Sequence, residues 1–213
     1  YFTERAASLD GVDVRHQNLS ILRRLALSER AYAGVAHSRS RVSSMAGEDE
    51  FSTVDGVPIN GVNVGMFFSG RGYLGGVRAT VHSLMRRNWS LSMHLAAKGG
   101  DDLYVKGVYN NSIDAALRLT KSYDSGASFS IIALSTVGER ALRSGSTQEA
   151  FTLTGDNLYN PSWGRQAGDV RSSRVRKDAV PFVVATLSAP IGEMTQMNIS
   201  LGGDYGLRSC STL

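Results

Sequence analysis

Cysteine, proline and long apolar runs are all scarce in this sequence of 213 residues. Cys210 is the only cysteine, so no disulfide can form within the chain, and a small secreted domain held together by disulfides is excluded. The longest apolar run, Ala179–Ala185, falls far short of the roughly 20 residues that a membrane-spanning helix needs. The net charge of +4 comes from Lys and Arg residues spread along the chain, which gives no indication of nucleic-acid binding.

The sequence also lacks a recognisable catalytic constellation. It contains no Gly-x-Ser-x-Gly motif, and Gly70–Gly72 and Gly75–Gly76 precede no helical pattern, so they indicate a tight hairpin rather than a phosphate-binding loop. His82 and His94 fall on the polar face of neighbouring predicted strands. Two histidines without a carboxylate or thiolate at ligand spacing are weak evidence for a metal site. We therefore predict no enzyme activity, no metal and no cofactor.

What the sequence has is alternation with a period of two residues. In Trp89–Lys98, apolar side chains occupy the odd positions, and polar side chains occupy the even ones apart from the small Ala96. Successive side chains of a strand point to opposite faces, so this pattern predicts a strand with one apolar and one polar face. A length of about ten residues is enough for a tilted strand to cross a bilayer.

Six further segments follow the same pattern, although Phe129–Val137 is apolar on both faces for part of its length. Apolar residues are odd-numbered in most of them. In an antiparallel pair, the residue numbers of every two facing residues add up to the same sum. Two odd-numbered apolar residues can face each other only if that sum is even. An even sum in turn requires an odd number of unpaired residues in the turn near Arg86. The six segments are Val62–Phe68, Val77–His82, Ile113–Thr120, Phe129–Val137, Val183–Ala189 and Met197–Tyr205.

The connections between these strands differ in length from one end to the other. Leu84–Asn88, Asp124–Ala127 and Pro190–Glu193 are short, whereas Gly99–Ser112 and Gly138–Asp178 are long. Alternate connections of an up-and-down meander lie at the same end, so one end carries only tight turns and the other only long loops. This asymmetry is typical of a transmembrane β-barrel.

Aromatic residues fit two interfacial girdles of such a barrel. Trp89 and Tyr123 fall at the tight-turn end, and Tyr104, Tyr109 and Tyr205 fall toward the long-loop end. A soluble antiparallel sandwich also alternates, with its apolar faces packed on each other. The sequence pattern therefore leaves a secreted β-sandwich adhesin or binding module as the alternative.

Residues 1–61 follow a different, mixed α/β pattern. Leu9–Val14 indicates a turn beside a short strand, and the apolar spacing within Leu19–Ala31 predicts a helix capped by Asn18. Asp-Gly and Asn-Gly pairs in Val54–Gly61 are strong turn signals. We expect residues 1–61 and 62–213 to form two structural units. Because the pattern runs up to both ends, we expect the chain to be a fragment of a longer protein.

The loop within Gly138–Asp178 is the best candidate for a ligand site, because loops this long without regular structure are usually functional or disordered. Its aromatic residues either stack on a ligand or anchor the loop to its neighbours. Its arginines either contact an anionic ligand or acidic lipid headgroups, or belong to a solvated basic stretch. The candidate ligand-contacting residues are Tyr159, Asn160, Trp163, Arg165, Arg171 and Arg174.

Two segments of this loop, Leu158–Gly164 and Arg171–Val175, resemble TonB-dependent outer-membrane receptors. The closest group is the branch whose full-length members carry a carboxypeptidase-like regulatory domain before the plug, and Tyr104–Tyr109 is similar to that group as well. The resemblance covers roughly residues 62–213 and extends more weakly into residues 9–61. The glycine-rich end of the family's plug is only loosely matched, by Gly56 and Gly61, and the TonB-contacting box would lie before Tyr1.

The resemblance implies a mainly β fold: about seven up-and-down strands of an antiparallel transmembrane β-barrel, preceded by the end of a small α/β plug domain. It implies that residues 1–61 belong to the plug and residues 62–213 to the barrel. It further implies a receptor in the bacterial outer membrane that takes up a scarce nutrient. The implied partners are the TonB energy-transducing complex, a nutrient ligand of unknown identity and outer-membrane lipid. Nucleic acid is not an implied partner.

Overall fold

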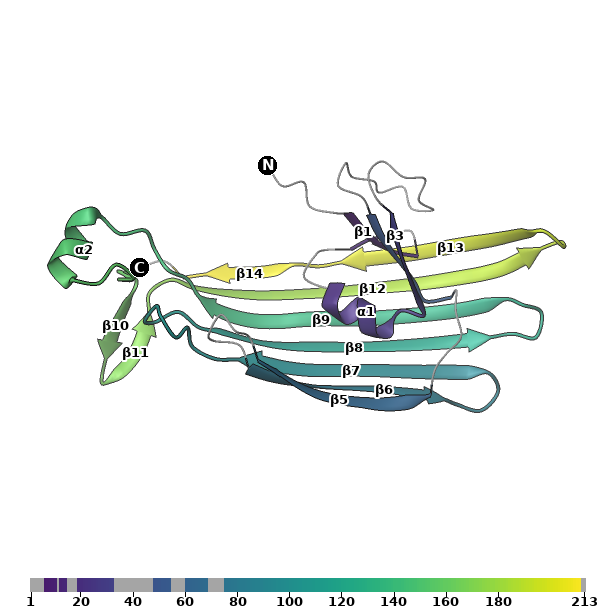
Figure 1. The fold of residues 1–213 in the computed structure, drawn as a ribbon. Helices are drawn as coiled ribbons and strands as arrows, with labels where there is room; N and C mark the ends of the chain where they lie inside the picture. Colours follow the sequence, from purple (N-terminus) through teal and green to yellow (C-terminus); the bar gives the residue numbers. More distant parts are fainter. Residues whose placement is uncertain are drawn as a thin grey trace.

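A computed structural model describes residues 6–10, 12–14, 19–32, 48–54, 60–68 and 75–211. The chain forms an N-terminal unit, a long sheet and a loop region (Figure 1). The N-terminal unit contains β1 (Ala6–Leu9), β2 (Val12–Asp13), α1 (Leu19–Leu25), β3 (Ser28–Tyr32) and β4 (Glu48–Ser52). The long sheet contains β5 (Gly61–Phe68), β6 (Gly75–Leu84), β7 (Trp89–Gly99), β8 (Asn110–Ser122), β9 (Ser128–Ala141), β12 (Val175–Ile191), β13 (Thr195–Asp204) and β14 (Leu207–Cys210). The loop region contains α2 (Gln148–Thr154), β10 (Trp163–Gln166) and β11 (Asp169–Ser172).

The long sheet confirms all seven predicted strands and their consecutive antiparallel pairing. Leu91 faces Leu119, and the other pairs of β7 and β8 have the same even number sum. At the first tight turn, the Met85 amide donates to the Trp89 carbonyl at 2.7 Å, so three residues remain unpaired, as the register requires. Strand β14 pairs with β12 in the same register as β13 does. Strands β13 and β14 are therefore two parts of one strand that is interrupted at Tyr205.

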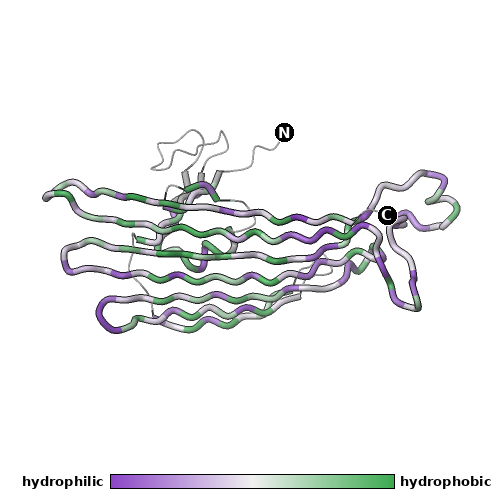
Figure 2. Tube along the Cα trace, turned by 180° about the vertical axis from the view of Figure 1, so that it is seen from behind, coloured by the Kyte–Doolittle hydropathy of each residue, from purple (hydrophilic) through white to green (hydrophobic). Residues whose placement is uncertain are grey.

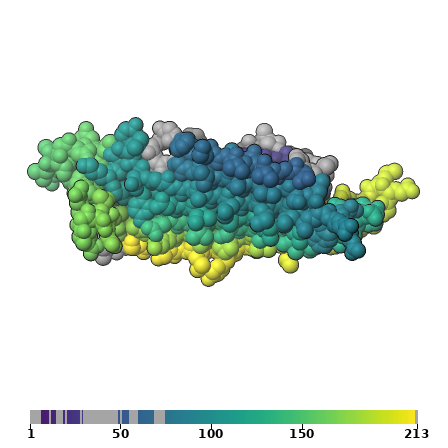
Figure 3. All heavy atoms as spheres, turned by 90° about the horizontal axis from the view of Figure 1, so that it is seen from below, coloured from purple at the N-terminus to yellow at the C-terminus, as the bar shows by residue number. Residues whose placement is uncertain are grey.

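One face of the long sheet, here called the open face, carries exposed apolar side chains. Figure 2 shows that hydropathy alternates along the strands, and Figure 3 shows the strands as a continuous wall. The soluble sandwich would require a second sheet over these side chains, and the described residues form none there. The sandwich is therefore not the fold observed. Large apolar residues exposed on this face are Val77, Val81, Met93, Leu95, Ile113, Leu117, Ile131, Val137, Val183, Leu187, Ile199 and Leu201.

The opposite face, here called the covered face, holds the N-terminal unit and is mainly polar. Many of its polar side chains are buried although they belong to a single sheet, among them Ser92, Arg118 and Thr186. Arg118 and Thr186 bond directly to the N-terminal unit, which covers them. A patch of apolar residues interrupts this polar face where α1 and the small sheet pack on β9 and β12. This packing explains why Phe129–Val137 is apolar on both sides. From the long sheet the patch contains Ile132, Leu134, Phe182 and Val184, and from the unit Leu9, Ile21, Leu22, Leu25 and Phe51.

Two polar contacts fix the N-terminal unit on the covered face. Arg118 of β8 donates from Nη1 to the carbonyl of Leu25, the last residue of α1, and from Nη2 to Ser92 Oγ at 2.8 Å. Asp10, in the turn after β1, accepts from Thr186 Oγ1 of β12 at 3.0 Å and from the Thr53 amide at 3.0 Å. The first contact satisfies a carbonyl that a helix end leaves without an intrahelical partner.

The predicted helix over Leu19–Ala31 is wrong beyond Leu25. Residues 28–32 form β3, which pairs antiparallel with β4, and the Leu27 amide donates to the Ser52 carbonyl at 2.8 Å. Pairing with β4 overrides the helical spacing of the sequence. The predicted turn within Leu9–Val14 is confirmed, because β1 and β2 pair there antiparallel. The predicted cap Asn18 and most of Val54–Gly61 lie outside the described residues.

The long loop contains regular structure that the sequence analysis did not predict. Helix α2 begins after Thr147, whose side chain accepts from the Ala150 amide, and ends at Gly155 in the left-handed conformation. Strands β10 and β11 form a hairpin whose turn includes Ala167. Among the described residues, no helix is long and apolar enough to cross a membrane.

Candidate ligand-binding site

Asn160 is the most deeply buried of the six predicted ligand-contacting residues. Its Nδ2 donates to the Lys106 carbonyl at 3.0 Å, and its Oδ1 accepts from the amides of Ser162 at 3.1 Å and Ser144 at 3.4 Å. These bonds join the long loop to the shorter loop after β7. Asn160 therefore organises the loop region from within.

Trp163 lies against the same shorter loop. A Cβ built on Gly107 would come within 2.2 Å of the Trp163 Cβ, and Gly107 has a φ of 73° that disfavours other residues. The Lys106 ammonium lies 5.7 Å from the centroid of the indole ring, within cation–π range. Tyr159 is also partly buried. The contacts of Trp163 with Lys106 and Gly107 join the two loops, and direct contact of either aromatic residue with a ligand stays a prediction.

The three predicted arginines are exposed, and they do not line a cavity together. Arg165 and Arg171 belong to the β10–β11 hairpin, where Arg171 faces Gly164 and Arg165 faces Val170. Arg174 follows the hairpin, and its Nη1 lies 3.5 Å from Ser144 Oγ. Neither of the two cavities described below is lined by any of the six predicted residues.

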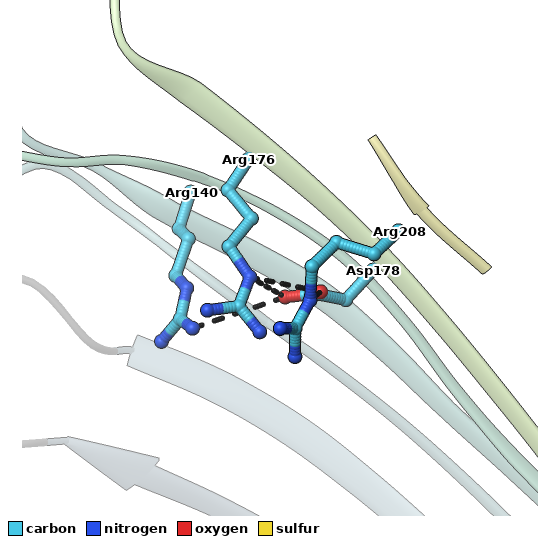
Figure 4. A network of polar contacts seen from close by, with 4 residues as sticks. All are labelled: Arg140, Arg176, Asp178 and Arg208. Atoms are coloured by element: carbon cyan, nitrogen blue, oxygen red, sulfur yellow. Dashed lines mark hydrogen bonds and ion pairs between the residues drawn. The ribbon is translucent and has the colours of Figure 1, made fainter. Parts of the chain in front are cut away.

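The structure instead brings together three arginines and one aspartate at the loop end of the covered face (Figure 4). Arg176 Nε lies 2.8 Å and Arg208 Nε lies 2.9 Å from a carboxylate oxygen of Asp178, and Arg140 Nη2 lies 3.8 Å from it. Register explains the gathering, because Arg140 faces Arg176 and Asp178 faces Arg208 across adjacent strands. We call Arg140, Arg176, Asp178 and Arg208 the arginine cluster. None of its four residues is among the predicted ligand-contacting residues, although their shared even numbering places them on one face of their strands.

A cavity of about 210 Å³ adjoins the arginine cluster. Arg140 and Asp178 line it together with Lys98, Ser112, Thr136 and Asn110. Lys98 Nζ is paired with Asp114 Oδ2 at 3.1 Å. The cavity therefore offers ammonium, guanidinium, hydroxyl and amide groups to an oxygen-rich ligand, beside the carboxylates of Asp178 and Glu139, which are ion-paired with Arg176 and Lys177.

A second cavity at the same level shares Ser112, Gly138, Glu139 and Asp178 with the first and is also lined by Arg208. It has a volume of about 440 Å³ and includes the apolar residues Ile113, Val137 and Leu207. Glu139 and Lys177 line its rim and form an ion pair at 3.0 Å. The Tyr109 hydroxyl donates to Glu139 Oε1, and burial together with this bond raises the pKa of Tyr109 to about 12.

The two histidines each bond a hydroxyl on the neighbouring strand. His94 Nδ1 lies 2.7 Å from Thr80 Oγ1, and His82 Nδ1 lies 2.8 Å from Ser92 Oγ. Among the described residues, no group of three or more His, Cys, Asp or Glu side chains is arranged to hold a metal ion. The histidines are thus part of the polar packing of the covered face.

The fold is that of part of an antiparallel up-and-down barrel wall with a small α/β unit against one face, and this confirms the predicted fold class. Among solved structures, the crystal structure of the ferric-catecholate import receptor Fiu from E. coli K12, in an open form, is similar to this chain with a TM-score of 0.66. The sequences are 9% identical, and the match covers 97% of this chain and 32% of that receptor. No protein-family model and no curated protein matches the chain.

Proposed function

We propose that this chain is part of an outer-membrane receptor that takes up a scarce nutrient with energy from the TonB complex. Residues 1–61 would be the end of the plug domain and residues 62–213 the first part of the barrel. The covered face would then line the barrel interior, and the open face would meet lipid. The likeness to a ferric-catecholate import receptor supports this assignment at the level of fold.

The exposed apolar face is the observation that carries the proposal. Met93 and Leu95 are 51% and 59% exposed, and similar side chains follow at the same level on each neighbouring strand. Soluble proteins rarely expose apolar patches of more than a few hundred Å². In a bilayer this face needs no protein partner, because it meets hydrocarbon instead.

The tight-turn end adds a feature expected at a membrane interface. The Lys121 ammonium lies 5.1 Å from the centroid of the Trp89 ring and 5.6 Å from that of Tyr123. Aromatic rings are enriched at the headgroup level of bilayers, and lysine side chains extend toward the same polar layer. The apolar band therefore ends in aromatic and basic groups, as a membrane strand should.

The experiment is cysteine labelling of the full-length protein on intact cells, in a Cys210→Ser background. Ala167→Cys, in the exposed β10–β11 turn, should react with an impermeant maleimide, and Ser125→Cys, in an exposed tight turn, should react only after lysis. The protein should also fractionate with membranes and show a heat-modifiable band. Recovery from the soluble fraction would reject the membrane assignment, and the reverse labelling pattern would invert the orientation.

Transport is tested separately by uptake in cells with and without a functional TonB complex. Ferric catecholate is the first ligand to try, because the structural neighbour is named for it. Uptake that persists without TonB would reject the energy-coupled part of the proposal and leave the barrel assignment standing.

A further inference from the structure

We propose that the arginine cluster and its adjoining cavity bind a dissolved ligand with at least two anionic oxygen groups, such as paired carboxylates, phosphates or catecholates. This inference rests on the proposed function, because it places the covered face inside the barrel. It concerns the loop end of that face, where β9, β12 and β14 meet.

The arginine cluster is unbalanced in charge. Among the described residues, three guanidinium groups share the carboxylate of Asp178, so the cluster carries two positive charges in excess. The neighbouring acids do not correct the excess, because Asp114 is paired with Lys98 and Glu139 with Lys177. A bound anion with two charges would neutralise the cluster.

The arginine cluster is unfavourable in energy without a ligand. Arg140 and Arg176 lie directly opposite each other on adjacent strands, and like charges in this position destabilise a sheet. Within the described part of the chain, Arg140 Nε is buried and has no hydrogen-bond partner. Burial of an unpaired charged donor costs free energy, which a ligand oxygen at that position would recover.

The donors of the cluster also have the shape that an anionic oxygen group requires. A guanidinium presents a planar fork of N–H groups that matches a carboxylate or phosphate, and Arg140 and Arg208 keep donors that Asp178 does not occupy. In Figure 4 the three guanidinium groups lie close together around the carboxylate. Ser112 and Thr136 add hydroxyl groups to the adjoining cavity.

The face on which the cluster lies distinguishes a dissolved ligand from a lipid. Arg140, Arg176 and Arg208 have the same even numbering as the covered-face residues, whereas lipid headgroups would meet the opposite face. The excess positive charge of the cluster raises the local concentration of oppositely charged ligands on the covered side.

The test uses the full-length receptor in detergent, with its heat-modifiable band as the measure of folding and inorganic pyrophosphate as the probe. Calorimetry should show that Arg140→Gln with Arg176→Gln weakens pyrophosphate binding about tenfold or more, as expected for lost charge-assisted hydrogen bonds. Arg86→Gln with Arg87→Gln is the matched control, because it removes the same charge from an exposed turn at the other end. Its affinity should stay within about twofold of the wild type.

Asp178→Asn supplies the opposite perturbation and still carries the test if the double arginine variant fails to fold. A ligand that competes with Asp178 for the arginines should bind about three- to tenfold more tightly once that carboxylate is neutral. A folded receptor that gives no pyrophosphate binding, equal losses in cluster and control variants, or weaker binding in Asp178→Asn would overturn the inference. These results are distinct from failure of the proposed function, which would appear as a soluble protein without a heat-modifiable band.

Discussion

Arg118 links the two parts of the molecule, and its replacement by methionine tests how the N-terminal unit is held. The side chain is 1% exposed and caps the last turn of α1 from the neighbouring strand β8. A methionine has a similar length and can fill the same space. The substitution therefore removes the charge and two hydrogen bonds while it leaves no large cavity.

The expected magnitude follows from opposing effects. A charge-assisted hydrogen bond such as the one to the Leu25 carbonyl contributes about 1.5–3 kcal/mol, and a cation at a helix C-terminus adds about 0.3–1 kcal/mol. Within the described residues, Arg118 Nε is buried without a partner, and methionine would remove that penalty of about 1–3 kcal/mol. The bond to Ser92 joins β8 to β7 and does not hold α1, so it is left out of this balance. The central values then give a net loss of about 1 kcal/mol, or about a fivefold change in the opening equilibrium.

Hydrogen exchange measured by mass spectrometry on the full-length receptor provides the assay. Amides of α1 and of Ala26 and Leu27 should exchange about fivefold faster in Arg118→Met, whereas amides of β8 and β9 should not change. Arg118→Lys retains the charge with a single donor group and should give a smaller effect. Unchanged exchange in α1 would show that the cap contributes nothing, and uniform loosening of the sheet would show that the reasoning about local capping is wrong.

Three further predictions concern the inner packing, the loop anchor and a titratable contact. Phe182→Ala should lower the free energy of unfolding by about 3–5 kcal/mol, because the Phe182 ring is buried against the N-terminal unit. Val183→Ala, on the open face, should change the free energy of unfolding by only about 0.5 kcal/mol. Equal effects of the two substitutions in urea titrations would contradict this prediction. Gly107→Ala should displace Trp163 and expose the segment between Arg143 and Arg174 to limited proteolysis, with Gly145→Ala, which meets no atom within 4 Å, as the control. Because the pKa of Tyr109 is raised from 10.0 to about 12, its bond to Glu139 stabilises the loop fully below pH 10 and is lost as the pH approaches 12. Protease sensitivity of residues 99–109 should rise over that range in the wild type and rise less in Tyr109→Phe, which lacks the titrating hydroxyl; an equal rise in both proteins would show that this bond does not stabilise the loop.

The sequence by itself determined the long sheet. Period-two alternation is a local property of a strand, so Trp89–Lys98 and its neighbours could be recognised one at a time. The shared odd numbering of apolar residues then required even pairing sums, which the structure shows for β7 with β8 and for β9 with β12. The contrast between tight turns and long loops was likewise visible in the spacing alone.

Local sequence signals also existed for α2, because Thr147 and Gly155 are ordinary cap residues, but a search for long apolar periodicity passes over a helix of seven residues. Helical spacing in Leu19–Ala31 was misleading for the opposite reason. Residues 28–32 pair with β4, and a partner so distant in the sequence cannot be seen in a local pattern.

Only the tertiary structure decided what lies on the covered face. Ile132, Leu134 and Phe182 look like exceptions in strands that should be polar on that side, until the N-terminal unit is seen to pack on them. The arginine cluster draws on three strands that are separated by tens of residues, and its members become neighbours only when each strand takes its register. Strand direction and face are local properties of a chain, but which side chains share a site depends on pairing between distant segments.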